Sequence, residues 1–307
     1  MTDSVPYHIP ALLPECLEAL DIRPGGVYVD ATYGGGGHSA AIMDSLDPGA
    51  GGCLYAFDQD MDAIRRAPSG DPRLEMVYSN FRYLTNWMRY YGVEGVDGIL
   101  ADLGVSSHHF DDAGRGFSFR ADGPLDMRMN QNARETAADI LASRSVEELT
   151  DMWRLYGEFG QARRLAQAVA KAREAGRTPE RISDLLGLAK PMTDPRKEKK
   201  ELAQVFQALR IEVNHELDAL RDLLEGALKV LRPGGRLAVI TYHSLEDRLV
   251  KNFMKTGNFE GRVEKDFFGR SSAPLKPVSG KPVVPSDEEV ERNPRARSAK
   301  LRTAIRL

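Results

Sequence analysis

The chain has 307 residues, more than a typical single domain, so we expect a large domain with a second unit or a sizeable insertion. Its 42 Lys and Arg nearly balance its 45 Asp and Glu, and the net charge of -3 excludes a molecule whose whole surface attracts phosphate groups. Contacts with nucleic acid must therefore be local. The two cysteines, Cys16 and Cys53, give neither a disulfide framework nor a metal-ligand spacing, and we expect no metal site.

Nothing in the hydropathy pattern predicts a membrane protein. No apolar run approaches the roughly 20 residues that span a bilayer, and the first residues lack the basic-then-apolar pattern of a secretory signal. We therefore expect a cytoplasmic protein that contacts no membrane. The sequence leaves the oligomeric state open, a homodimer included.

Strands and helices alternate through the first hundred residues. A turn at 23–26 leads into the first apolar strand, and the glycine run Gly34 to Gly37 follows that strand at once. The apolar periodicity predicts strands at 27–31, 53–57, 74–78 and 96–100, and helices at 12–20, 38–46, 62–67 and 81–91. This alternation is typical of a parallel, doubly wound α/β sheet.

The alternation stops after Asp102. Residues 104–130 are rich in Gly, Asp, Ser and Arg and predict a long loop, after which helical patterns dominate at 145–156, 160–175 and 179–190. A strand at 236–242 and a closing edge strand at 299–307 then complete the sheet, and a return helix precedes them with a stripe of Leu217, Leu220, Leu224, Leu228 and Leu231. We therefore predict a sheet domain, 1–106 and 214–307, that is interrupted by an all-helical insertion, 107–213.

The glycine run is the first chemical signal. Glycines after a buried strand let the backbone approach a ligand and aim the N–H groups of the next helix at it. No Lys-Ser or Lys-Thr follows the run, which removes the P-loop interpretation. Asp58 lies 24 residues beyond Gly34, at the end of the next strand, where a carboxylate can accept both ribose hydroxyls of an adenosine-containing cofactor. NAD and S-adenosylmethionine both satisfy this pattern.

Three features favour S-adenosylmethionine. Asp30 places a negative charge where a sulfonium and an ammonium would lie, and the same charge would repel the pyrophosphate of a dinucleotide. A Pro-Gly-Gly turn like 233–235 is frequent in methyltransferase domains, and a tail strand would complete their seven-stranded sheet. We therefore predict a class I (Rossmann-like) methyltransferase fold, with an NAD-dependent oxidoreductase as the alternative.

Seven motifs, in one order, make the family specific. They cover 29–39, 102–107, 115–119, 124–129, 206–210, 243–248 and 293–298, and the most characteristic read Asp-Leu-Gly-Val-Ser-Ser, Arg-Gly-Phe-Ser-Phe and His-Ser-Leu-Glu-Asp-Arg. With these motifs, nearly the whole chain resembles the bacterial 16S ribosomal RNA cytosine-N4 methyltransferase family. The resemblance implies methyl transfer from S-adenosylmethionine to the exocyclic N4 amine of a cytosine in the decoding region of the small subunit. It also implies a methyltransferase sheet with a helical insertion, which we interpret as the part that recognises the substrate.

The resemblance also implies a set of cofactor contacts. Carried onto this sequence, they fall on Gly35, Gly36, Gly37, His38, Asp58, Phe81 and Asp102. The family's next contact is a Gln, but where its motif reads Ser-Ser-Pro-Gln-Leu-Asp this chain reads Ser-Ser-His-His-Phe-Asp at 106–111. His109 therefore takes the place of that Gln, and its imidazole can still donate a hydrogen bond.

Asp102 is the candidate catalytic residue. N4 methylation needs a group that accepts the amino hydrogens, and amine methyltransferases place it at the end of the fourth strand. The usual Pro-Pro-aromatic motif is missing there, so Asp102 as a cofactor ligand alone stays open. For His243 at the end of strand five, a structural hydrogen-bonding role is the preferred interpretation.

The aromatic and basic residues of the long loop stay ambiguous. Phe117 and Phe119 are suited either to stacking on a base or to pinning the loop, and Arg115 and Arg128 either to RNA phosphates or to pairing with Asp126. A second alternative for the whole chain is a non-catalytic RNA-binding ribosome-assembly factor with a methyltransferase-like fold.

Overall fold

Two compact units make up the computed structural model, which describes residues 10–105, 110–264 and 272–307. We call them the strand unit, 1–104 with 218–307, and the helical unit, 105–217. The chain therefore enters the strand unit twice, before and after the helical unit. Within the described residues, no helix is both long enough and apolar enough to cross a membrane.

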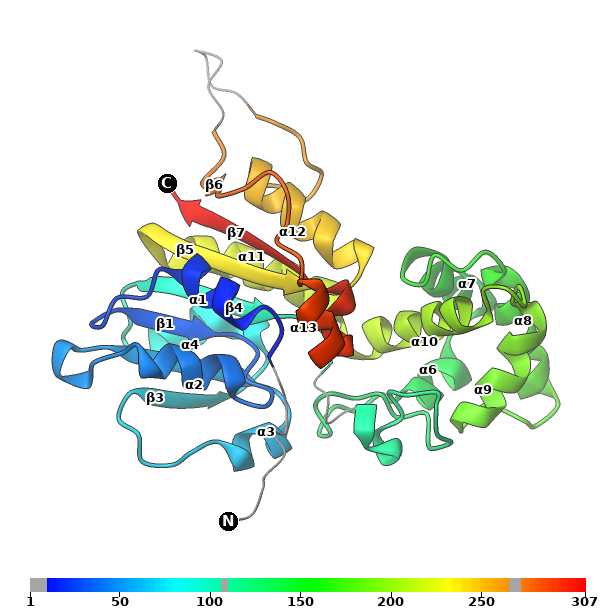
Figure 1. The fold of residues 1–307 in the computed structure, drawn as a ribbon. Coiled ribbons are helices and arrows are strands. Elements are labelled where there is room, and N and C mark those ends of the chain that lie inside the picture. Colours follow the sequence, from blue (N-terminus) through cyan, green and yellow to red (C-terminus); the bar gives the residue numbers. More distant parts are fainter. Residues whose placement is uncertain (1–9, 106–109, 265–271) are drawn as a thin grey trace. The chain divides into compact units, whose positions relative to one another are not determined.

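A seven-stranded sheet forms the centre of the strand unit (Figure 1). Its order is β3-β2-β1-β4-β5-β7-β6, in which β1 to β5 run parallel and β7 runs antiparallel to both of its neighbours. The strands are β1 (Val27–Asp30), β2 (Cys53–Asp58), β3 (Leu74–Tyr78), β4 (Val96–Asp102), β5 (Leu231–Thr241), β6 (Leu275–Pro277) and β7 (Lys300–Arg306). This topology confirms the predicted Rossmann-like methyltransferase sheet.

Two details of the last strands differ from the prediction. The tail strand β7 is not an edge strand, because β6 pairs along its outer side. Strand β5 begins at Leu231 rather than Arg236: Leu231 pairs with Val96 and Arg236 with Gly98, and the register shifts between these pairs. The Pro-Gly-Gly turn at 233–235 is therefore an irregularity inside β5.

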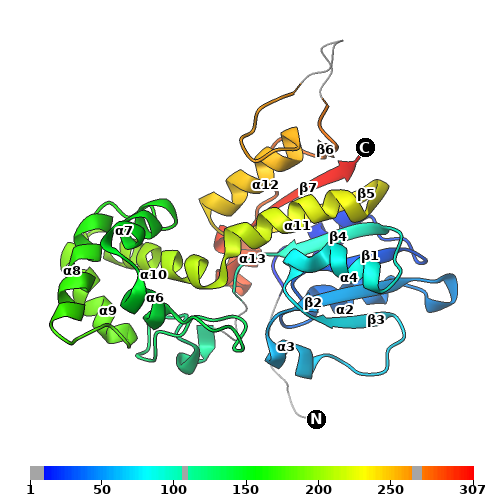
Figure 2. The ribbon, with the colours of Figure 1, turned by 180° about the vertical axis from the view of Figure 1, so that it is seen from behind.

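Helices cover both faces of the sheet. The face seen from the front in Figure 1 carries α1 (Leu13–Leu20) and α2 (Gly37–Asp44), and α3 (Met61–Arg66) packs on the same side of β2. The other face, turned to the viewer in Figure 2, carries α4 (Leu84–Tyr90), α11 (Glu216–Val230) and α12 (Ser244–Thr256). Side chains of β1 and β4 therefore enter two separate cores, as a parallel sheet buried on both faces requires.

The return helix α11 buries a face slightly different from the predicted stripe. Leu220 and Leu224 are fully buried as expected, but Leu223 and Ala227 complete the face, while Leu217 and Leu228 are only half-buried. The buried positions are thus spaced three and four residues apart, which keeps them on one side of the helix. At about 25 cal/mol per Å² of apolar surface, this leucine-rich face is a large contributor to the core.

The C-terminal stretch also contacts the beginning of the chain. Helix α13 (Asp287–Arg292) follows β6, and the Leu12 N–H donates a hydrogen bond of 2.7 Å to Oε1 of Glu289. Leu12 adopts a left-handed conformation with φ 53°, and its side chain is fully buried. Residues just before α1 are therefore held in place from the other end of the chain.

The helical unit has a core of its own. It comprises α6 (Ala137–Ser143), α7 (Val146–Leu155), α8 (Ala162–Glu174), α9 (Ile182–Ala189) and α10 (Glu198–Asn214). Trp153 is fully buried in this core, and its indole N–H donates to the Val205 carbonyl at 3.3 Å. Thr136 and Ser145 begin α6 and α7 with reciprocal capping boxes, which satisfy N–H groups that a helix start leaves open.

Short 3-10 turns connect several of these elements. They are η1 (Pro48–Ala50), η2 (Phe81–Tyr83), η3 (Ala113–Arg115), η4 (Lys190–Met192) and η5 (Pro294–Ser298). The turn η3 lies in the segment where the composition predicts a long loop; residues 110 and 111 are helical, and among the described residues 112–130 no longer helix or strand is formed.

Candidate active site

The candidate site lies at the carboxyl ends of three neighbouring strands. Asp30 ends β1, Asp58 ends β2 and Asp102 ends β4. Strand β1 lies between β2 and β4. The chain continues from β1 to β2 and β3 on one side of β1, and then crosses to β4 on the other side. Doubly wound sheets bind their ligands at such a reversal of the strand order. Three carboxylates that are distant in sequence therefore meet at one edge of the sheet.

The glycine run forms a tight turn between β1 and α2. Gly34 and Gly36 have φ angles of 53° and 77°, which side chains rarely allow, and a Cβ on Gly36 would come within 2.5 Å of the Tyr33 hydroxyl. Gly36 is buried whereas Gly35 is exposed. The turn brings the first N–H groups of α2, from Gly37 and His38, to the strand ends, as an adenosine cofactor site requires.

Asp30 and Asp58 hold this turn in place. The Gly34 N–H donates to Oδ2 of Asp58 at 2.8 Å, and the Ser39 hydroxyl donates to Oδ2 of the buried Asp30 at 2.6 Å. Oδ1 of Asp58 accepts from the Asp60 N–H at 2.8 Å. The predicted ribose acceptor is thus oriented by backbone N–H groups on both oxygens, one of them from the glycine run itself.

Phe81 follows the neighbouring strand β3. It begins η2, is half-buried, and packs against the core under α4. Just before it, the Asn80 side-chain amide donates to the Gln59 side chain at 2.9 Å, which joins the loops after β2 and β3. The structure therefore places Phe81 in the loop next to Asp58. The other predicted cofactor contact, His109, lies outside the described residues.

Asp102 has a different environment from the other two carboxylates. Its side chain is 15% exposed, its N–H donates to the Thr32 hydroxyl at 2.7 Å, and its Oδ1 accepts from the Tyr242 hydroxyl at 2.8 Å. Burial raises the pKa of Asp102 to about 6, against the opposing effects of His38 and the Tyr242 hydrogen bond. Asp102 therefore ionises close to neutral pH, which suits a group that accepts a proton.

His38 faces the other oxygen of Asp102. Its Nε2 lies 3.0 Å from the Ala11 carbonyl, which can only accept, so Nε2 carries a hydrogen. In the neutral ring Nδ1 is then bare, and it lies 3.8 Å from Oδ2 of Asp102. The buried imidazole is thus held at Nε2 by the Ala11 carbonyl, and its Nδ1 faces Asp102 beyond hydrogen-bond distance; the backbone N–H of residue 38 lies in the first turn of α2.

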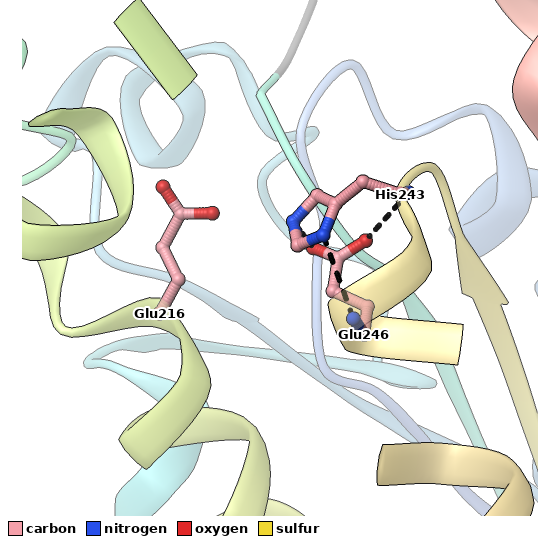
Figure 3. Close-up of side chains that lie close together, drawn as sticks. All are labelled: Glu216, His243 and Glu246. Carbon is pink, nitrogen blue, oxygen red and sulfur yellow. Dashed lines mark hydrogen bonds and ion pairs between the residues drawn. The ribbon is translucent and has the colours of Figure 1, made fainter. Parts of the chain in front are cut away.

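His243 acts as a helix cap. It precedes α12, its Nδ1 accepts from the Glu246 N–H at 3.5 Å, and Oε2 of Glu246 accepts in return from the His243 N–H at 3.4 Å (Figure 3). Its Nε2 lies 3.1 Å from Oε1 of Glu246 but without the geometry of a hydrogen bond. These contacts support the structural interpretation of His243. Glu216, also drawn in Figure 3, pairs with Arg210 of the helical unit at 2.8 Å.

The loop residues of the helical unit are also structural. Phe117 is buried, and Phe119 packs on Phe206 with ring centroids 5.4 Å apart. Arg128 forms two hydrogen bonds to Asp126, at 2.9 and 2.7 Å, and the buried Arg115 donates to the carbonyls of residues 128 and 129. Of the two interpretations that the sequence allows, the structure therefore favours pinning of the loop and pairing with Asp126.

Three site residues were not predicted from the sequence. The Thr32 hydroxyl accepts from the Asp102 backbone N–H, the Tyr242 hydroxyl donates to the Asp102 carboxylate, and the Ala11 carbonyl accepts from His38. Tyr242 stands directly before His243 at the end of β5, so its place at the same sheet edge as Asp102 was a usable signal. Ala11 carries no signal, because only its carbonyl takes part.

The donor set at these strand ends fits an adenosine cofactor that carries positive charge. Asp30, Asp58 and Asp102 put three carboxylates around one glycine turn, an arrangement that attracts a sulfonium and an ammonium and opposes a pyrophosphate. Backbone N–H groups orient Asp58, the predicted ribose acceptor, at this edge of the sheet. Sheet and site together define a methyltransferase of the Rossmann-like class.

Known sequences identify the family. The model of the MraW methylase family matches residues 6–307, and this chain belongs to that family. A protein of Parabacteroides distasonis is 63% identical over 98% of both chains, one of Phocaeicola vulgatus 59% over 97% of both, and one of Porphyromonas gingivalis 52% over 98% of this chain and 97% of its own. Each of the three carries the name ribosomal RNA small subunit methyltransferase H. The predicted methyltransferase activity is thereby confirmed, and the oxidoreductase and the non-catalytic assembly factor are left without support.

A solved structure resembles the chain more distantly. An rRNA methylase of Streptococcus thermophilus aligns with 100% of this chain and 99% of its own at 13% identity and a TM-score of 0.41.

Proposed function

We propose that this protein transfers a methyl group from S-adenosylmethionine to the exocyclic N4 amine of a cytosine in 16S ribosomal RNA, in the decoding region of the small subunit. The observation that carries the chemistry is Asp102, a nearly buried carboxylate with a pKa near neutral at the edge of the glycine turn. The names of the relatives and the seven motifs support the choice of RNA and of base.

The glycine turn and its neighbours would hold the cofactor. Backbone groups of Gly35 to His38 would contact it, Asp58 would accept the ribose hydroxyls, and Phe81 and Asp102 would complete the site. When bound, S-adenosylmethionine supplies an electrophilic methyl group on a positively charged sulfur. We expect His109 to add a donor where the family has a Gln.

Asp102 would take the proton that the reaction releases. Methylation replaces one N4 hydrogen by a methyl group, so the amine must lose a proton as its lone pair is used. Above a pH of about 6 Asp102 is ionised and can accept the amino hydrogen, which also draws the lone pair out of conjugation with the ring. A free cysteine is not required, because N4 attack involves no addition to the ring, and Cys16 is buried with its pKa raised by burial.

The helical unit would bind the RNA around the target base. It holds as many acidic as basic side chains, and several of its arginines form internal ion pairs, such as Arg144 with Glu135 and Arg154 with Asp151. Helix α8 is different: Arg163, Arg164 and Lys171 are exposed on one side, and within the described chain none of them has an ion pair. They span about 12 Å along the axis, at the rise of an α-helix, and suit contacts with successive phosphates.

The decisive experiment maps the product. Small subunits that lack the modification are incubated with the protein and labelled S-adenosylmethionine, and the labelled nucleotide is located by mass spectrometry. We expect one labelled cytosine with the methyl group on N4, and no uptake by subunits that already carry it. Label on a ring carbon, on a different base, or only on protein would refute the proposal.

A further inference from the structure

Among the residues that the structure describes, the hydroxyl of Tyr242 has one hydrogen bond, to Oδ1 of Asp102 at 2.8 Å. We propose that Tyr242 is a positioning residue for methyl transfer, which anchors Oδ1 of the ionised Asp102 so that Oδ2 is the oxygen presented to the amine proton. This inference rests on the proposed role of Asp102 and adds a second residue to it.

The backbone and ring of Tyr242 are themselves fixed. Its N–H donates to Oε2 of Glu246 at 2.9 Å, which ties the end of β5 to the first turn of α12. Its ring packs on the core beneath α1 that contains Leu100 and Ile240, and a Cβ on Gly104 would touch the ring at 3.5 Å. A hydroxyl held on so constrained a ring can fix the rotation of a neighbouring carboxylate.

Asp102 is held from three directions. Thr32 accepts from its backbone N–H, Tyr242 donates to Oδ1, and His38 faces Oδ2 at the longer distance of 3.8 Å. The two oxygens are therefore unequal, because Oδ1 has a full hydrogen bond whereas Oδ2 does not have one at that distance. Oδ2 is the oxygen better able to accept a new proton.

Tyr242 can only act as a donor here. Burial, followed by the charge of Asp102, raises its pKa well above the ordinary value of a tyrosine, so the hydroxyl is protonated at neutral pH. It therefore cannot serve as the proton acceptor. Its effect on the reaction must pass through Asp102.

The groups around Asp102 oppose one another. Burial is the largest influence and raises the pKa of Asp102, and the negative charges of Asp30 and Glu246 act in the same direction. His38 and the Tyr242 hydroxyl lower it. Removing the hydroxyl must then raise the pKa of Asp102, and the activity that needs its ionised form must appear only at higher pH.

The test compares two Tyr→Phe variants. Tyr242→Phe removes the hydroxyl at Asp102, and Tyr91→Phe removes an equivalent one that donates to Oε1 of Glu75 at 2.9 Å, between α4 and β3. Single-turnover methylation of unmodified small subunits is measured between pH 5.5 and 9 with saturating S-adenosylmethionine. In wild type, the rate should fall at low pH as Asp102 is protonated. We expect the midpoint of this fall, the acid limb of the pH profile, to move up by about one pH unit in Tyr242→Phe, because a hydrogen bond to a charged group is strong and its loss raises the pKa of Asp102. Tyr91→Phe should coincide with the wild type.

A midpoint does not depend on how much of the sample is active, so partial misfolding of Tyr242→Phe would not hide the shift. The same shift should appear without turnover in the ¹³C carboxyl resonance of Asp102, assigned by its loss in Asp102→Asn. An unchanged limb and an unchanged resonance in Tyr242→Phe would overturn the positioning role. If Asp102→Asn itself retained full activity, the proposed role of Asp102 would fail instead, so the two failures are distinguishable.

Discussion

Asp102 in the strand unit and Asp126 in the helical unit are both aspartates in which only a minor part of the side chain is exposed, 15% and 22%. Around Asp126, burial raises the pKa, but the side-chain and backbone hydrogen bonds of Arg128 outweigh it and leave the pKa below its ordinary value. Among the described residues, no arginine compensates for the burial of Asp102, and its pKa rises to about 6. In the helical unit, the charge of Asp126 is therefore paired with Arg128. In the strand unit, Asp102 can gain or lose a proton close to neutral pH.

The difference distinguishes a structural carboxylate from a chemical one. Arg128 gives Asp126 a bidentate partner that fixes the loop after Phe117. Asp102 has only one strong side-chain donor, Tyr242, and a histidine beyond hydrogen-bond distance. An ionised carboxylate with so few partners destabilises the folded protein, but it accepts a proton more readily than a paired carboxylate does.

The largest expected effect is on catalysis. Asp102→Asn should lower the rate of methyl transfer by about 10²–10⁴-fold, the usual range for loss of a general base. Asp126→Asn should leave the rate within about threefold of wild type at a temperature at which it stays folded. In the wild-type protein the rate should fall as pH drops through about 6, because Asp102 becomes protonated. Single-turnover rates measure the effect of each substitution and the effect of pH. Equal losses of rate in Asp102→Asn and Asp126→Asn would contradict a chemical role that is specific to Asp102.

A smaller effect is expected on cofactor affinity. Asp58→Ala should weaken binding of S-adenosylmethionine by about 10–100-fold, because it removes the ribose acceptor and also the anchor of the Gly34 N–H. Isothermal titration calorimetry measures the dissociation constant. Asp71→Ala provides the control, since Asp71 pairs with Arg73 away from the strand ends. Unchanged affinity in Asp58→Ala would contradict the assignment.

The two aspartates should also differ in their effect on stability, with opposite signs. Asp102 has a raised pKa, so the stability associated with its neutral form is present at low pH and is lost as pH rises through about 6. Asp102→Asn should therefore raise the free energy of unfolding at pH 8 by about 1–3 kcal/mol and by roughly half as much at pH 5, because the unfolded aspartate is already ionised there.

Asp126 has a lowered pKa, so its contribution is present above its ordinary value and is lost only in acid. Asp126→Asn should lower the free energy of unfolding at pH 8 by about 1–3 kcal/mol, because it leaves Arg128 half-buried without its partner. Urea unfolding at pH 5 and pH 8 provides the measurement. If Asp102→Asn lowered the free energy of unfolding at pH 8, the prediction would be wrong, because the ionised Asp102 would then stabilise the folded protein.

The smallest expected effect concerns the surface of the helical unit. Removing one unpaired cation, in Arg164→Gln, should reduce the salt dependence of RNA binding by about 0.7–0.9 in the log-log slope, and the triple change with Arg163→Gln and Lys171→Gln by roughly 2. Arg154→Gln is the matched control, because Arg154 is 65% exposed but pairs with Asp151. Equal slopes for Arg164→Gln and wild type would leave α8 outside the interface.

Sequence patterns located the parts of the site that follow directly from chain order. Gly34 to Gly37, Asp58 and Asp102 all stand at the end of an apolar strand, and parallel strands bring such ends to one edge. The motifs of the family supplied His38 and Phe81. What the order of the sheet leaves open is the orientation of each side chain, so the bond between Tyr242 and Asp102 could not be derived from the sequence.

The elements that were misplaced share a physical cause. The position of β7 inside the sheet depends on the three residues of β6, which are too short to show a strand period. The bulge at 233–235 continues β5 through Pro and Gly, which ordinarily signal an end. On α11, Leu217 and Leu228 are as apolar as their neighbours but lie at the margin of the buried face. Long-range contacts, not local preference, decide such positions.

The strand order has a consequence for how the protein is made. β4 and β5 are adjacent in the sheet, but the whole helical unit is translated between them. β7 lies between β5 and β6 in the sheet, comprises residues 300–306 and follows all the other strands in chain order. Because chains emerge at about 5–20 residues per second, the helical unit can fold before the sheet has all its strands. The sheet of the strand unit therefore gains β5, β6 and β7 only after the helical unit has been made.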